Sequence, residues 1–225
     1  RGAIWDSMQR REVYGTSGPR MLLWFDLLNP PGSRGGVAPM GSEITMTEPP
    51  IFQARAVGSF EQKPGCPDGS AAALGEEDLE RICKGECYHP SDVRRPITRI
   101  EVVKVTPQRV EGEEVAPLIA NPWQVFECEP DPGGCAVTFA DPAFQAGQRD
   151  AVYYVRAFEA PAPGINAGNL RCEGADGECE KVTLCPSEGA DDDCLSEHEP
   201  RAWSSPIWVD LPGPPQVTAH NGVRP

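Results

Sequence analysis

The sequence predicts a mainly β protein: an antiparallel β-sandwich whose long loops are tied by disulfides. At least seven strand-like runs alternate with turn-rich segments, a pattern typical of sandwiches. The 225 residues include 23 glycines and 25 prolines, which are too many helix breakers for a helical bundle. Nine cysteines, in a chain long enough to bury a core without cross-links, indicate an oxidising compartment, either the periplasm or the extracellular space.

The chain begins with a helix and a short strand that do not fit the sandwich. Residues 2–11 place Ile4, Trp5 and Met8 on one stripe, which predicts an amphipathic helix. Residues 13–16 have the composition of a short strand, and the Ser-Gly-Pro sequence after them is a break. We therefore expect the segment up to residue 18 to be the end of another domain.

The sandwich strands follow as apolar runs bounded by glycine and proline. In one of them the apolar positions change parity between Val102 and Val103, which predicts a β-bulge. The predicted strands are residues 20–28, 51–59, 97–106, 123–128, 135–139, 151–159 and 203–210.

For some of these strands the sequence also predicts a pairing or the residues that share a face. The strands at 123–128 and 135–139 flank a Glu-Pro-Asp-Pro-Gly-Gly turn, so they are expected to form a hairpin. The last strand is expected to place Trp203, Ile207 and Val209 on one face.

Two insertions interrupt the strand pattern, at residues 60–95 and 165–200. The first is rich in charge and glycine and contains one predicted short helix, at 76–84. In the second, residues 171–200 carry ten acidic groups against two basic ones, which indicates a solvated loop held by cysteines.

The cysteines divide into three local groups, and all nine are disulfide candidates. A bridge between Cys128 and Cys135 would close the base of the predicted hairpin. Four more, Cys172, Cys179, Cys185 and Cys194, lie in one polar loop and allow two bridges in three connectivities. The remaining three are Cys66, Cys83 and Cys87, so the odd thiol is expected among them, unless its partner lies outside the chain.

Zinc is the alternative interpretation of that trio. Cys66, Cys83 and Cys87, together with His89, would supply four ligands of the kind zinc prefers. The spacing is not the C-x2-C of common zinc sites, so a disulfide with an exposed histidine is the expectation, and no metal site is assigned.

Charge and hydropathy exclude two classes of partner. The formal net charge is −14, so duplex nucleic acid and anionic membrane surfaces would be repelled. The sequence has no apolar run of 18 residues, so no membrane span is predicted.

Several segments together resemble a bacterial family catalogued as domain of unknown function 3604. Their order and spacing carry the resemblance, since no single motif is diagnostic. The segments are residues 4–8 (IWDSM), 11–20 (REVYGTSGPR), 85–92 (GECYHPSD), 153–157 (YYVRA) and 201–207 (RAWSSPI).

The resemblance implies a domain division and a chemistry. Members of this family resemble metal-dependent phosphoesterases with a polymerase-and-histidinol-phosphatase type α/β barrel. Residues 1–18 would be the last helix and strand of that barrel, and residues 19–225 the β-sandwich that follows it. The upstream barrel would be the partner domain and would hold the divalent metal, so this chain alone is expected to hold no cofactor and to be inactive.

Four residues then become candidates for contact with substrate. Tyr14, Thr16, Ser17 and Arg20 would sit at the end of the final barrel strand, at the edge where α/β barrels gather their active sites. Arg20 would hold an anionic oxygen through its guanidinium. The alternative is a tight domain junction in which Arg20 pairs with a carboxylate.

Two functions are therefore carried forward. The first is the C-terminal part of an exported metal-dependent hydrolase that itself lacks the metal site. The second is a non-catalytic extracellular β-sandwich module that binds a sugar or a protein partner.

Overall fold

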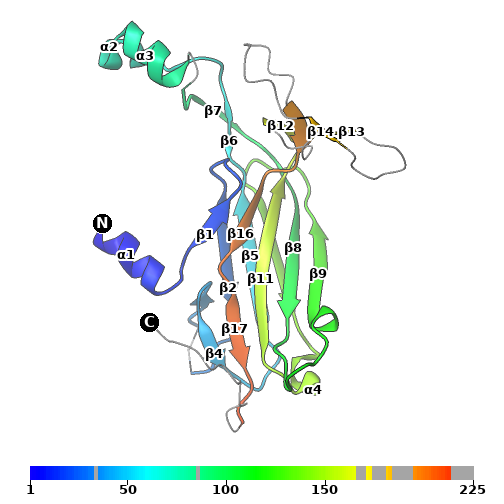
Figure 1. The fold of residues 1–225 in the computed structure, drawn as a ribbon. Helices are drawn as coiled ribbons and strands as arrows, with labels where there is room; N and C mark the ends of the chain where they lie inside the picture. Colours follow the sequence, from blue (N-terminus) through cyan, green and yellow to red (C-terminus); the bar gives the residue numbers. More distant parts are fainter. Residues whose placement is uncertain (33–34, 85–86, 166–170, 174–180, 184–194, 214–225) are drawn as a thin grey trace.

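The computed structural model is a mainly β protein built around two packed sheets (Figure 1). It describes residues 1–32, 35–84, 87–165, 171–173, 181–183 and 195–213. The predicted fold class, antiparallel sheets with disulfides, is confirmed for this part of the chain. None of the helices in it combines the length and apolar character that a bilayer crossing needs.

In the described residues the larger sheet has seven strands and the smaller has four. The larger sheet contains β1 (Tyr14–Thr16), β4 (Glu43–Thr45), β8 (Ile97–Val105), β9 (Ile119–Glu127), β11 (Ala151–Glu159), β16 (Arg201–Ser204) and β17 (Ile207–Asp210). The smaller sheet contains β2 (Leu22–Leu27), β3 (Ala38–Pro39), β5 (Ile51–Val57) and β10 (Cys135–Ala140). Within these two sheets every described pairing is antiparallel except that of β17 with β4.

The core lies between the two sheets and is rich in aromatic rings. Strands β2 and β5 alternate buried and exposed residues, as expected when only one face of a sheet is covered. Phe25, Phe52 and Phe139 of the smaller sheet stack with centroids 5.3–6.4 Å apart. The ring of Phe52 also packs against that of Tyr153 in the larger sheet, with 4.7 Å between the ring centroids, so aromatic packing joins the two sheets.

The sheet is irregular where a bulge was predicted in β8, but the bulged strand is its neighbour β9. The pairing of β8 with β9 shifts register between Val102 and Lys104. Val102 and Val103 are both buried, although successive residues of a regular strand face opposite sides. Three residues of β9, 121–123, face the single residue Val103, so the extra residues belong to β9, whereas β8 pairs with β11 without interruption across Val102 and Val103.

The predicted hairpin around the Cys128–Cys135 turn is wrong, although its disulfide forms. Strand β9 pairs with β8 in the larger sheet, whereas β10 pairs with β5 in the smaller one. The chain crosses between the layers at this turn, and the disulfide ties the two sheets together at that crossing. A short loop between two strand-like runs favours a hairpin by local rules, and the packing of the apolar faces overrides it.

The predicted last strand, 203–210, is two strands. Both β16 and β17 pair with β11, and Ser205 and Pro206 separate them. The interruption shifts the alternation by one residue, because proline cannot donate to the ladder. Trp203 is consequently 37% exposed, while Ile207 and Val209 are fully buried, so the three do not share a face.

The N-terminal segment contributes a strand to the larger sheet. Helix α1 (Gly2–Gln9) has no buried side chain, and β1 pairs with β16 as an edge strand. Arg11, between them, stacks on Trp208 with 4.5 Å between the guanidinium carbon and the ring centroid. The domain boundary at residue 18 stays a prediction, but β1 is hydrogen-bonded into the larger sheet of the sandwich.

The two insertions form protrusions at one end of the sandwich (Figure 1). The first is the ribbon of β6 (Phe60–Gln62) and β7 (Pro90–Arg94), which carries α2 (Ser70–Leu74) and α3 (Glu76–Cys83). Helix α3 confirms the predicted helix. The second contains the pairs β12 (Ala162–Ile165) with β15 (Leu195–His198) and β13 (Arg171–Glu173) with β14 (Lys181–Thr183). Two short helical turns, η1 (Ala116–Leu118) and α4 (Phe144–Gly147), complete the described elements.

Asp210 at the end of β17 provides a test of electrostatics in this sheet. Burial raises the pKa of its carboxyl, and the nearby carboxylates of Asp150 and Glu43 raise it further. A raised carboxyl pKa in the folded state means that stability is present at low pH and is lost as pH rises through the folded pKa. We expect Asp210→Asn to raise the melting temperature at pH 7 and to leave it unchanged near pH 3. Asp68→Asn removes the same charge at an exposed loop position and is the control. Equal effects of both variants at pH 7 would contradict the local explanation.

Candidate functional site

A cavity of about 390 Å³ lies where the sandwich meets its two protruding ribbons. Its volume is in the range of small-molecule sites. The lining combines two arginines and a histidine with the aromatic rings of a phenylalanine and a tyrosine. The residues are Gly18, Pro19, Arg20, Ser59, Phe60, Gln62, Tyr88, Arg95, Ala162, Pro163, His198 and Pro200.

Arg20 and Arg95 supply the positive charge of this pocket. Arg20 lies in the link between β1 and β2, and its guanidinium stacks on the ring of Tyr88 at 4.0 Å. Among the described residues no carboxylate is within ion-pair distance of either arginine. The expected alternative of an Arg20–carboxylate junction is therefore not what the described residues form. Stacking orients the guanidinium while leaving its donors available.

The backbone of Arg95 lies unusually close to the backbone of Gly58. The Arg95 amide donates to the Ser59 carbonyl at 2.9 Å. A Cβ placed on Gly58 would lie 1.9 Å from the Arg95 carbonyl oxygen. Only glycine fits at position 58 without displacing the pocket wall.

Behind this wall lies a fully buried carboxylate. Glu159 Oε1 accepts a hydrogen bond from the Ser59 amide at 2.5 Å, and the Glu159 amide donates to the Pro200 carbonyl at 2.9 Å. The second oxygen, Oε2, has no hydrogen-bond partner in the part of the chain that the structure describes. Glu159 thus connects two residues of the lining, Ser59 and Pro200, to the end of β11.

His198 is also part of the lining. Its Nδ1 lies 2.9 Å from the Ala162 carbonyl oxygen, and since a carbonyl can only accept, Nδ1 carries the proton. Nε2 is then an acceptor in the neutral ring and a donor in the protonated ring. A Cβ on Gly164 would lie 2.4 Å from Cε1 of this ring, so the glycine makes room for it.

Of the four residues predicted near a substrate, only Arg20 lines this pocket. The Tyr14 hydroxyl donates to the Met21 carbonyl at 3.0 Å, and the Ser17 hydroxyl accepts from the Arg201 amide at 2.9 Å. Thr16 lies in the pairing of β1 with β16. Tyr14 borders a second, smaller hollow of about 230 Å³ with Trp24. These bonds are structural, and they position the link that carries Arg20.

Sequence reasoning missed Arg95, His198 and Glu159. The pocket residues come from segments far apart in the chain, so no spacing motif connects them. Arg20 and Tyr88 lay in two of the segments that carried the family resemblance, and this was the signal in the sequence that pointed toward the pocket.

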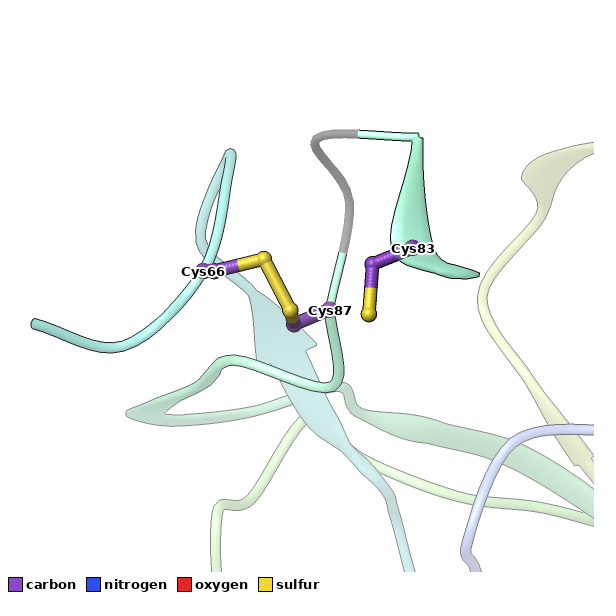
Figure 2. Close-up of side chains that lie close together, drawn as sticks. All are labelled: Cys66, Cys83 and Cys87. Carbon is purple, nitrogen blue, oxygen red and sulfur yellow. A yellow bond between two sulfur atoms is a disulfide. The ribbon is translucent and has the colours of Figure 1, made fainter. Parts of the chain in front are cut away.

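The cysteine trio lies beside the same ribbon. Cys66 and Cys87 form a disulfide, and Cys83 at the end of α3 is a free, half-buried thiol. All three Sγ atoms are within 4.8 Å of one another (Figure 2). The odd thiol of the chain's described part is therefore in the trio, as expected.

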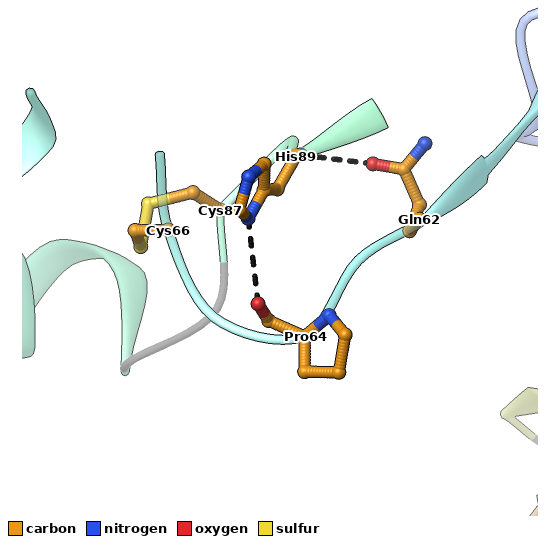
Figure 3. The surroundings of a disulfide bond; sticks show 5 residues. All are labelled: Gln62, Pro64, Cys66, Cys87 and His89. Carbon is orange, nitrogen blue, oxygen red and sulfur yellow. Dashed lines mark hydrogen bonds between the residues drawn. A yellow bond between two sulfur atoms is a disulfide. The ribbon is translucent and has the colours of Figure 1, made fainter. Parts of the chain in front are cut away.

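His89 does not complete a four-ligand set with these sulfurs. Its Nδ1 lies 3.3 Å from the Pro64 carbonyl oxygen, and its amide donates to Gln62 Oε1 at 3.0 Å (Figure 3). Two of the three sulfurs are joined to each other and are not thiolate ligands. The other disulfide candidates fall outside what the structure describes: the Cys172 side chain and residues Cys179, Cys185 and Cys194.

Comparison with known proteins finds one partial likeness. Residues 1–26 match the model of a family described as a protein of unknown function (DUF3604). The matched segment covers α1, β1 and most of β2, so it continues past residue 18 into the smaller sheet. No curated protein matches the chain. No solved structure matches it either.

Proposed function

We propose that this chain is a non-catalytic β-sandwich binding module of an exported protein, and that its pocket takes an acidic sugar. The observation that supports it is the pair of arginines, Arg20 and Arg95, which line one cavity without a described carboxylate partner. In a chain of net charge −14, an uncompensated pair of cations is a local exception that suits an anionic ligand.

The volume of the pocket and its polar side chains restrict the class of ligand that it could bind. A cavity of about 390 Å³ exceeds what a bare inorganic anion fills. Arginine binds carboxylates through two parallel hydrogen bonds, so the two guanidinium groups would hold the acidic group. The ring of His198 would meet a hydroxyl, which can either donate to Nε2 or accept from it.

Export is supported by the disulfides. The described residues contain two, Cys66–Cys87 and Cys128–Cys135, and such bonds persist in oxidising compartments. On this ground we propose that the protein works in the periplasm or outside the cell.

The binding proposal predicts a charge-selective loss on mutation. Titration calorimetry should detect glucuronate and not glucose, and Arg20→Gln should weaken glucuronate binding about tenfold, because a charge-assisted contact is lost. Arg55→Gln is the matched control, since Arg55 also stacks on an aromatic ring, Trp24 at 4.4 Å, outside the pocket. Equal weakening by both variants would overturn the assignment. Binding of inorganic phosphate as tight as glucuronate would overturn the sugar component.

A second candidate function concerns the protein of which the chain would be part. The family match over residues 1–26 and the exposed apolar stripe of α1 favour it. Ile4, Trp5 and Met8 are 68%, 63% and 58% exposed, and α1 buries no side chain. We propose that this stripe packs against an upstream α/β barrel domain of a metal-dependent, phosphoesterase-like hydrolase, with the divalent metal held in that barrel.

That candidate predicts an inactive chain. With bis(p-nitrophenyl) phosphate and added Mn²⁺, Mg²⁺ or Zn²⁺, the chain alone should give no turnover above the metal-only rate. Turnover that Arg20→Gln abolishes and Arg55→Gln leaves intact would contradict it, because the chemistry would then lie in this chain.

A further inference from the structure

The disulfide beside the pocket has a third cysteine within reach. The Sγ atoms of Cys66, Cys83 and Cys87 lie within 4.8 Å of one another, and Cys83 is a free thiol. Figure 2 shows the three side chains facing the same small space. Thiol–disulfide exchange needs a thiolate that can approach one sulfur of a disulfide, and this geometry brings the reactants together without unfolding.

We propose that Cys83 is the attacking thiol of a built-in exchange that moves the disulfide among Cys66, Cys83 and Cys87. The Cys83 thiol loses its proton to solvent, and the thiolate attacks one sulfur of the Cys66–Cys87 bond. A new S–S bond forms to Cys83, the old bond breaks, and the departing thiolate of the third cysteine takes up a proton. Electrons balance within the trio, so no outside oxidant or reductant takes part.

The exchange has a structural consequence because of where the disulfide sits. Cys66 follows β6 and Cys87 precedes β7, so the bond closes the outer end of that ribbon. The Lys63 amide donates to the His89 carbonyl at 2.7 Å, and the Cys87 amide donates to the Gly65 carbonyl at 3.2 Å, next to the bond. Either alternative bond, Cys66–Cys83 or Cys83–Cys87, would remove the direct disulfide between the two arms of the ribbon.

Tyr88 connects the trio to the pocket. It is the residue after Cys87, it lines the cavity, and its ring supports the guanidinium of Arg20 at 4.0 Å. Moving the disulfide releases the chain on one side of Tyr88 and so loosens the support of Arg20. This consequence for ligand binding rests on the proposed function, whereas the exchange itself does not.

Peptide mapping tests the exchange directly. Unreduced protein is held at pH 8, quenched with acid, alkylated and digested with trypsin, whose cuts after Arg81 and Lys84 place the three cysteines on separate peptides. We expect alkylation on more than one of the three peptides. Alkylation confined to the Cys83 peptide at every time point would overturn the proposal. The Cys128–Cys135 bond has no third thiol beside it among the described residues, so the single tryptic peptide that holds both cysteines, residues 110–149, is the internal control and should stay unlabelled.

Two variants keep the test decisive. Cys87→Ser and Cys66→Ser each leave Cys83 with one possible partner, and each should form the alternative disulfide when treated with oxidised glutathione. Failure of both variants to do so, with circular dichroism equal to that of the parent protein, would also overturn the proposal.

Ligand binding then separates this inference from the proposed function. Cys83→Ser, which fixes the Cys66–Cys87 bond, should bind glucuronate like the parent protein, and Cys66→Ser should bind it about fivefold more weakly or worse. If no form binds glucuronate while the peptide map shows exchange, the proposed function fails and the exchange stands. If Cys66→Ser carries the Cys83–Cys87 bond and binds as tightly as Cys83→Ser, the link between the trio and the pocket is wrong.

Discussion

Replacing Asp141 with alanine is expected to lower the free energy of unfolding by about 3–5 kcal/mol, the usual cost of breaking a buried ion pair from one side. Asp141 is 1% exposed and follows β10 of the smaller sheet. Its Oδ2 accepts from the ammonium of Lys104 and from the hydroxyl of Tyr153, the latter at 2.6 Å. Both partners belong to the larger sheet, so this carboxylate is a polar link between the layers.

The size of the effect follows from what the mutation leaves behind. Without the carboxylate, the Tyr153 hydroxyl is fully buried and unpaired, and Lys104 keeps its charge only 19% exposed. Burial and the hydrogen bond to Asp141 raise the pKa of Tyr153, so its hydroxyl stays a donor that needs an acceptor.

Urea denaturation followed by tryptophan fluorescence measures this prediction. Trp123 reports on the site, since its ring lies 5.8 Å from that of Tyr153. Asp141→Asn, which keeps an acceptor oxygen, should cost less than Asp141→Ala. A triple variant with Asp141→Leu, Lys104→Met and Tyr153→Phe should recover much of the loss, because the ammonium and the hydroxyl that lose their acceptor are removed too and only the Ala143 amide loses a partner. A loss under about 1 kcal/mol for Asp141→Ala would contradict the account.

Gly58→Ala is the second change with a large expected effect, about 3 kcal/mol or more. The new Cβ would meet the Arg95 carbonyl oxygen at 1.9 Å and its carbonyl carbon at 2.9 Å. Both are backbone atoms, so no side-chain rotation relieves the overlap, and β5 and the start of β8 must move apart.

The same substitution should damage the pocket. Arg95 lines it, and the Arg95 amide bonds to the Ser59 carbonyl beside the glycine. We expect Gly58→Ala to lower the melting temperature and to weaken glucuronate binding. Gly15→Ala and Gly69→Ala are the controls, because an added Cβ at either position meets nothing within 4 Å. Melting temperatures for all three variants within a degree or two of the parent would show that the close approach is absent in solution.

Much of the strand pattern followed from local sequence. Apolar runs bounded by glycine and proline located β2, β5, β8 and β11, and a change of parity pointed to the irregular pairing of β8 with β9 without showing that β9 carries the extra residues. Local proximity along the chain also led to the Cys128–Cys135 disulfide and to the odd thiol of the trio. These features depend on residues a few positions apart, which is the range over which propensity and spacing carry information.

The sheet to which each strand belongs was decided by tertiary packing. The turn at Cys128–Cys135 has hairpin composition, yet the apolar faces of β9 and β10 cover opposite sides of one core. Likewise, the edge position of β1 depends on β16, nearly two hundred residues later. Local sequence patterns cannot predict a pairing between residues so far apart, because the free energy that favours it comes from burying the apolar faces of the two sheets against each other.

Even less of the candidate site than of the fold could be predicted from the sequence. The sequence alone singled out Arg20 as a cation that could hold an anionic oxygen, and it identified Cys66, Cys83 and Cys87 as a group. It did not connect Arg20 with Tyr88, Arg95 or His198, since these come from four separate links and ribbons. Only the folded chain brings them to one cavity, because the close backbone contact at Gly58 and the protruding ribbons set their positions.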